Sequence, residues 1–186
     1  LDASASMLAG DPTNALIRRN LDDVTKRRSD KWQRAVRTVE WVTANMPPDV
    51  FFQVFTFNTT AQPLIKGTAT DWLSTSDEDD TRTALENLRL VVPGNGTSLY
   101  NAFKASRELT PIPDNIFLIV DGLPTMGLAP TKATVIYPAD RLRLFNESLG
   151  QRPGGVPVNI VLFPMQGDPD ATPAYWMLAF NTGGAL

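Results

Sequence analysis

The spacing of hydrophobic positions along the chain alternates between a helical repeat and short continuous apolar runs. In segment 32–46 (WQRAVRTVEWVTANM), Trp32, Val36 and Val39 recur at helical spacing while charged residues occupy the other positions. This pattern predicts an amphipathic helix. The β-branched and aromatic run FFQVFTF at 51–57 then predicts a strand.

The same alternation continues to the end of the chain. Helices are predicted at 81–90, 97–109, 138–150 and 172–180, and strands at 116–120 and 157–163. The run IFLIV is continuously apolar, as expected of a strand buried on both faces, and PVNIVLF is predicted to be a second buried strand. Helices that alternate with such strands indicate an α/β layer protein with a mostly parallel sheet.

Two polar segments and the two ends of the sequence do not fit this simple alternation. Segment 8–30 is rich in charges and is predicted to be a surface excursion with a helical turn or two. The acidic run DEDD at 77–80 is interpreted as a solvated helix start rather than a calcium loop.

A sheet of this type would have apolar residues before Asp2 and a further strand after Gly184. We therefore expect residues 1–186 to be a single domain with truncated ends, belonging to a longer protein.

Composition narrows the possible function. With 186 residues, 42% hydrophobic and 20% charged, the chain can bury one ordinary core. A net charge of −3 gives no general attraction to nucleic acid or anionic lipid, and no apolar run approaches the roughly 18 residues of a membrane span. The absence of histidine and cysteine excludes Ser-His-Asp and Cys-His catalysis, structural zinc sites and disulfides.

Polar residues that could carry chemistry follow predicted strands. They are Asp2, Ser4 and Ser6 in DASAS, Thr97 in GNGTS, and Asp121 at the end of IFLIVD. Because ligands of open α/β sheets bind beyond the carboxyl ends of the strands, these oxygens can converge at one edge. Oxygen ligands without imidazole or thiolate suit Mg²⁺ or Mn²⁺, and Ca²⁺ less well.

These motifs resemble those of von Willebrand factor A domains. DASAS is similar to the family's D-x-S-x-S motif, and GNGTSLYNAF to its G-G-T-x-L-x-x-A loop and helix, with Asn95 and Gly96 where two glycines are common. IFLIVDGLPT resembles a strand followed by D-G-x-P-T, with Val120 where threonine or serine often stands. WMLAFNTGGAL resembles the family's late helix and Gly-Gly, so the likeness spans nearly the whole chain.

The resemblance implies a doubly wound α/β fold with helices on both faces and a metal-ion-dependent adhesion site. Carried over residue by residue, Asp2, Ser4, Ser6, Thr97 and Asp121 would form the metal shell. The implied function is non-catalytic protein binding, in which an acidic side chain of a partner protein completes the coordination. Segments 8–30 and 126–137 would then set partner selectivity. A bacterial protein of the cell envelope, or a secreted one, is the expected source.

Simpler structural roles are open for each of these residues. Asp2, Ser4 and Ser6 could make turn and cap hydrogen bonds, and Asp121 with Gly122 could form a turn. Thr97 could be the N-cap of the helix that follows it. A metal that only stabilises a structural subunit is a further possibility.

Three other classes of site are less consistent with the sequence. A dinucleotide site is disfavoured because Leu99 stands where Gly94-x-Gly96 requires a third glycine. A serine nucleophile would need Lys31 or Lys104 as its base, and nothing in the spacing places either lysine beside Ser4 or Ser6. A Mg²⁺-dependent phosphate ester hydrolase is the stronger enzyme alternative, but no basic residue adjoins the three loops in the sequence to hold a phosphate.

Overall fold

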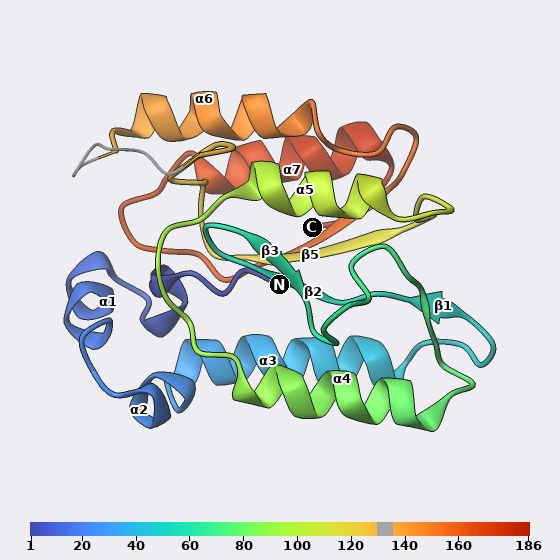
Figure 1. The fold of residues 1–186 in the computed structure, drawn as a ribbon. Helices are drawn as coiled ribbons and strands as arrows, with labels where there is room; N and C mark the ends of the chain where they lie inside the picture. The colour runs from blue at the N-terminus through green and yellow to red at the C-terminus, as the bar shows by residue number, and fades with distance from the viewer. Residues whose placement is uncertain (130–135) are drawn as a thin grey trace.

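A central sheet separates two layers of helices in the computed structural model, which describes residues 1–129 and 136–186. Figure 1 shows α3 and α4 on one face of the sheet and α5, α6 and α7 on the other. The helices are η1 (Ala5–Leu8), α1 (Pro12–Arg18), α2 (Asp23–Arg27), α3 (Asp30–Ala44), α4 (Glu78–Leu90), α5 (Leu99–Glu108), α6 (Pro138–Leu149) and α7 (Ala171–Thr182). The strands are β1 (Phe51–Phe52), β2 (Phe55–Phe57), β3 (Ala61–Pro63), β4 (Leu73–Ser74), β5 (Ile116–Val120) and β6 (Val158–Leu162).

Residues 1–3 form the centre of the sheet, although only Asp2 makes a regular bridge, a parallel one to Phe57. The Asp2 amide donates to the Ile119 carbonyl at 2.8 Å, and the Ala3 amide donates to the Phe57 carbonyl at 2.7 Å. The spatial order is therefore β3, β2, residues 1–3, β5 and β6. β5 and β6 are parallel and β3 is antiparallel to β2, which confirms the predicted doubly wound, mostly parallel α/β class.

Side chains of the central strands alternate between two hydrophobic cores, as the period of two in a strand requires. Ile119 belongs to the core under α3 and α4, where Trp32 is fully buried. Leu118 and Val120 belong to the core under α5 to α7, with Tyr175 at its centre. Each helical layer thus has its own core, and the sheet is buried from both sides.

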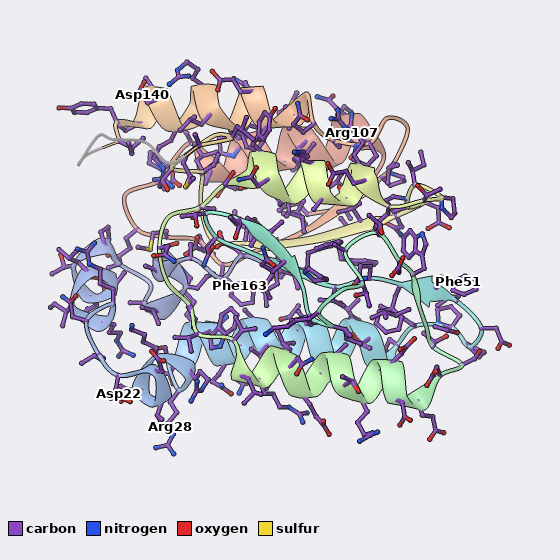
Figure 2. All side chains as sticks on the ribbon, in the orientation of Figure 1. Asp22, Arg28, Phe51, Arg107, Asp140 and Phe163 are labelled. Carbon is purple, nitrogen blue, oxygen red and sulfur yellow. The ribbon has the colours of Figure 1, made fainter. Side chains whose placement is uncertain are left out.

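The predicted helices are all present, with boundaries that differ by a few residues. α4 begins at Glu78 because the Asp77 carboxylate accepts the Asp79 amide at 2.9 Å, so the acidic run is a helix start. Segment 8–30 contains α1 and α2, each capped by an aspartate. Figure 2 shows Asp22 and Arg28 at the surface of α2, which confirms the predicted surface excursion.

Two strand predictions need correction. The run 51–57 is divided into β1, which pairs with β4, and β2, which pairs with β3, and the Val54 amide between them donates to Gln53 Oε1 at 2.9 Å. In β5, Phe117 is 50% exposed, so this run is buried on both faces only over its last three residues. Phe117 lines an apolar cavity of about 930 Å³ between β5 and the chain at 51–55.

The structure describes only part of the expected selectivity segment 126–137. Residues 130–135, within the expected selectivity segment 126–137, lie outside the described residues. In the two described stretches, the structure contains no helix with both the length and the apolar character needed to cross a membrane.

Candidate metal centre

Three loops are held together at the carboxyl edge of the sheet by backbone hydrogen bonds. The Gly94 amide donates to the Ala3 carbonyl at 2.8 Å, and the Ala5 amide donates to the Asn95 carbonyl at 3.0 Å. Asn95 reaches this position with a φ of 65°, a left-handed conformation that asparagine tolerates better than most residues. These bonds bring the GNGTS loop against DASAS, as the predicted convergence required.

Two serine hydroxyls and one carboxylate form a chain of hydrogen bonds in this cluster. The Ser6 hydroxyl donates to Asp121 Oδ1 at 2.9 Å, and Ser4 Oγ lies 2.8 Å from Ser6 Oγ. Because the single proton of Ser6 is directed at Asp121, Ser4 is the donor to Ser6. Both hydroxyls therefore direct their protons along this chain and keep oxygen lone pairs for a ligand.

The two oxygens of the Asp2 carboxylate are bonded differently, which bears on whether a cation fits the cluster. Its Oδ1 accepts the Ser4 amide at 2.7 Å, whereas its buried Oδ2 has no hydrogen-bond partner among the residues described. Burial, followed by the negative charge of Asp121, raises the pKa of Asp2 from 3.8 to about 7. A buried carboxylate oxygen without a hydrogen-bond donor, close to a second negative charge, is stabilised by a cation. Asp2 and Asp121 therefore fit a site for a positive ion.

The composition of the cluster limits which ion it could hold. In the described part of the chain, no group of three or more acidic, histidine or cysteine side chains is arranged to hold a metal ion. A cation here would depend on the carboxylates of Asp2 and Asp121 and on neutral hydroxyls. Such an all-oxygen set fits Mg²⁺ or Mn²⁺.

Thr97 is connected to the site through its backbone. Its amide donates to the Thr125 hydroxyl at 2.9 Å, and its carbonyl accepts the Thr125 amide at 3.0 Å. The N-cap of α5 is Ser98, whose hydroxyl accepts the Asn101 amide at 3.2 Å. The alternative that Thr97 caps this helix is therefore wrong.

Lys31 is part of the cluster, although no feature of the sequence places it there. Its Nζ lies 2.8 Å from Asp121 Oδ2 and donates to the carbonyls of Ala9 at 3.1 Å and Ser6 at 3.3 Å. Met165 Sδ is 3.7 Å away. Three oxygen acceptors use the three protons of an ammonium group, so Lys31 is placed as a cation and not as the base for a serine nucleophile.

Comparison with known proteins agrees with this architecture. No family profile and no curated protein matches the sequence. A solved structure of a von Willebrand factor type A protein from Catenulispora acidiphila superposes with a TM-score of 0.52 at 18% identity, and the match covers 98% of this chain. The chain has a von Willebrand factor A fold. It spans 41% of the length of that structure's chain.

In this von Willebrand factor A fold, a buried ion pair supports the loop that follows β5. Asp168 Oδ2 accepts the Leu123 amide at 2.7 Å and lies 2.8 Å from the Arg141 guanidinium. The Tyr175 hydroxyl donates to the Gly122 carbonyl at 2.9 Å. A Cβ on Gly122 would lie 2.6 Å from Asp168 Oδ2, so glycine is required there for the close approach.

The sequence prediction missed Asp168 and Lys31 for different reasons. Asp168 lies in the loop after strand β6, further from the strand end than Asp121 is from the end of β5, so a search of the strand ends alone does not single it out. Lys31 is the second residue of α3 and resembles any charged residue at the start of an amphipathic helix. No local signal in the sequence identifies its contact with Asp121.

Proposed function

We propose that the chain is a protein-binding module that holds a divalent cation, Mg²⁺ or Mn²⁺, and uses it to bind an acidic side chain of a partner protein. The shell would consist of Asp2, Ser4, Ser6, Thr97 and Asp121. The observation that carries the proposal is the buried Oδ2 of Asp2, which has no hydrogen-bond partner among the described residues and lies within the electrostatic influence of Asp121. When bound, the cation supplies positive charge and an exchangeable position that an incoming carboxylate can occupy.

The residues of the chain prepare this site in two ways. The hydrogen-bond chain from Ser4 through Ser6 to Asp121 orients both hydroxyls before any ligand arrives. Five protein oxygens and one carboxylate oxygen from a partner would supply the six that Mg²⁺ prefers. The two carboxylates balance the charge of a divalent cation, and the neutral hydroxyls fill coordination positions without making the site anionic, so a further carboxylate can still coordinate.

The surface near the site favours a protein ligand over a small one. η1, which contains Ser6, packs against α1, and Figure 1 shows both at the side of the molecule where β5 ends. Leu16, Ile17 and Val24 of this excursion are 55%, 58% and 48% exposed. Exposed apolar side chains on an element that packs against the site are consistent with a protein interaction surface.

A catalytic role has less support from the contacts. Lys31 is the basic group that a phosphate ester hydrolase would need near the metal, but its protons are directed at Asp121, Ser6 and Ala9. A phosphate would have to compete with a buried carboxylate for this ammonium. We therefore propose a non-enzymatic module, and metal-dependent turnover of a generic phosphate ester would contradict this.

The first experiment is calorimetric titration of the metal-stripped protein with Mg²⁺ and Mn²⁺, using wild type, Thr97→Ala and Ser98→Ala. Wild type should bind one ion. Thr97→Ala should bind about tenfold more weakly or worse, a loss of about 1.4 kcal/mol, and remain folded, because Thr97 does not cap α5. Ser98→Ala is the matched control, since it removes the cap at a cost of about 1 kcal/mol in stability and should retain metal affinity.

The partner class is tested with peptides that carry a single Asp or Glu, each compared with its Asn or Gln analogue. Binding should require both the acidic residue and the metal, and should be lost with a chelator. If a folded wild-type protein shows no saturable metal binding, the proposal is wrong. If metal binds and stabilises the fold but acidic and amide peptides bind equally, the metal has only a structural role.

A further inference from the structure

Lys31 places its ammonium group inside the candidate metal centre. Its side chain is 9% exposed and that of Asp121 is 3% exposed, so the ion pair is almost completely removed from solvent. A buried charge is tolerated only where it is paired and hydrogen bonded. The structure meets this requirement with the Asp121 carboxylate and two carbonyl oxygens.

The position of Lys31 is fixed by the packing of α3. Trp32, the next residue in the chain, is 0% exposed, and Ser29, two positions before Lys31, is 2% exposed. The two carbonyls that accept from Nζ belong to Ser6 and Ala9, so they lie within or directly after the turn η1 that carries Ser6. The ammonium is therefore held by the same turn that supplies a proposed metal ligand.

The two carboxylates of the candidate metal centre are neutralised to different extents. Asp121 is paired with Lys31 through Oδ2 and bonded to Ser6 through Oδ1, whereas Asp2 Oδ2 has no partner among the described residues. A divalent cation that binds between the two carboxylates would stand close to the ammonium. Like charges at short range in a poorly solvated site repel strongly, so the cation and the ammonium compete for Asp121.

We propose that Lys31 is a tethered counterion that neutralises Asp121 in the metal-free protein, and that a divalent cation binds in competition with it. Lys31 thereby sets the metal concentration at which the site fills. This inference rests on the metal-dependent function proposed above, and adds a residue that opposes metal binding to the residues that favour it. A flexible four-carbon stem allows the ammonium to withdraw from Asp121 without moving α3.

The inference is tested with Lys31→Met, which keeps the stem of the side chain and removes its charge. Mn²⁺ affinity, measured by calorimetry or by electron paramagnetic resonance of free Mn²⁺, should rise at least about tenfold over wild type. In a chelator the variant should unfold at a lower temperature than wild type, because Asp121 loses its buried partner, and added Mg²⁺ should restore most of this loss. Lys104→Met is the matched control, because the Lys104 side chain is 45% exposed and pairs at the surface with Glu108.

A second variant and a wild-type measurement cover the case in which Lys31→Met does not fold. Lys31→Gln keeps hydrogen-bond donors without the charge and should also bind Mn²⁺ more tightly than wild type. In nitrogen NMR of the wild type, the buried Lys31 ammonium should give a slowly exchanging signal that shifts or broadens when Mg²⁺ is added.

The outcomes separate this inference from the proposed function. Equal Mn²⁺ affinity in wild type, Lys31→Met and Lys31→Gln would overturn the role of Lys31 and leave the metal-dependent function intact. Binding by the variants but not by wild type would support the role of Lys31 and overturn metal-dependent function in the native chain. Absence of binding in all three folded proteins would overturn both.

Discussion

Thr97 and Thr125 are joined by a reciprocal pair of hydrogen bonds, from the Thr97 amide to the Thr125 hydroxyl at 2.9 Å and from the Thr125 amide to the Thr97 carbonyl at 3.0 Å. The pair connects the loop before α5 with the loop after β5. The relative position of Thr97 and Asp121 therefore depends on a side chain, that of Thr125, which is not itself a proposed ligand.

Thr125→Val should loosen this connection without changing the shape of the side chain. The Thr97 amide would lose its acceptor in a residue that is 4% exposed, and an unsatisfied buried amide costs about 1–3 kcal/mol. Urea unfolding should show this loss, and metal titration should show weaker binding. Thr70→Val, at an exposed position, is the control and should change neither the unfolding free energy nor the metal affinity. A stable Thr125→Val with normal metal affinity would contradict the role of the pair.

Gly96→Ala should disturb the same contact from the opposite side. A Cβ on Gly96 would lie 2.9 Å from Thr125 Oγ1, so the loops must separate, at a cost of about 1–3 kcal/mol. Gly94→Ala is a close control because its Cβ would meet nothing within 4 Å. Thermal unfolding of the two variants should rank Gly94→Ala well above Gly96→Ala, and the reverse order would mean that the loop approach is not tight.

Asp168→Ala should destabilise the loop that carries Asp121. The change leaves the Leu123 amide and the Arg141 guanidinium without their carboxylate, and breaking a buried pair costs about 3–5 kcal/mol, less here because Arg141 keeps some contact with water. Asp140→Ala removes a carboxylate from an exposed pair with Arg143, and Figure 2 shows Asp140 at the surface of α6. Denaturant unfolding of this control should stay within about 1 kcal/mol of wild type.

The stability of the metal-free protein should fall as pH rises from about 4 to about 7. Burial and the charge of Asp121 raise the pKa of Asp2 from 3.8 to about 7, so over this range the folded protein keeps a proton that the unfolded chain has lost. Raising the pH therefore favours unfolding, and the effect is complete above pH 7. Each pH unit across the range contributes about 1.4 kcal/mol at most.

Unfolding free energies measured against pH, with a chelator present, test this slope. Asp2→Asn should remove the Asp2 contribution, and a saturating concentration of Mg²⁺ should flatten the wild-type curve because bound metal favours the ionised carboxylate. If, in chelator, the unfolding free energy of wild type changes with pH as that of Asp2→Asn does, Asp2 titrates near its ordinary pKa and the prediction is wrong.

Much of the fold follows from local patterns in the sequence. The helical spacing of Trp32, Val36 and Val39 predicted α3, and the apolar run IFLIV predicted β5, because each pattern reports which side chains must leave water. The division of 51–57 could not be predicted in the same way. It depends on the pairing of β1 with β4 and of β2 with β3, which are contacts between separate parts of the chain.

The sequence by itself determined that Asp2, Ser4, Ser6 and Asp121 follow strands of one parallel sheet, because strand patterns and their polar ends are local features. Only the tertiary structure decided that Ser98, rather than Thr97, caps α5, since both hydroxyls are equally suited by type. It also decided that Lys31 pairs with Asp121, ninety positions away. A charged residue at the start of a helix is normally solvated, and this one is buried only because α3 packs against η1 at the edge of the sheet where β5 ends.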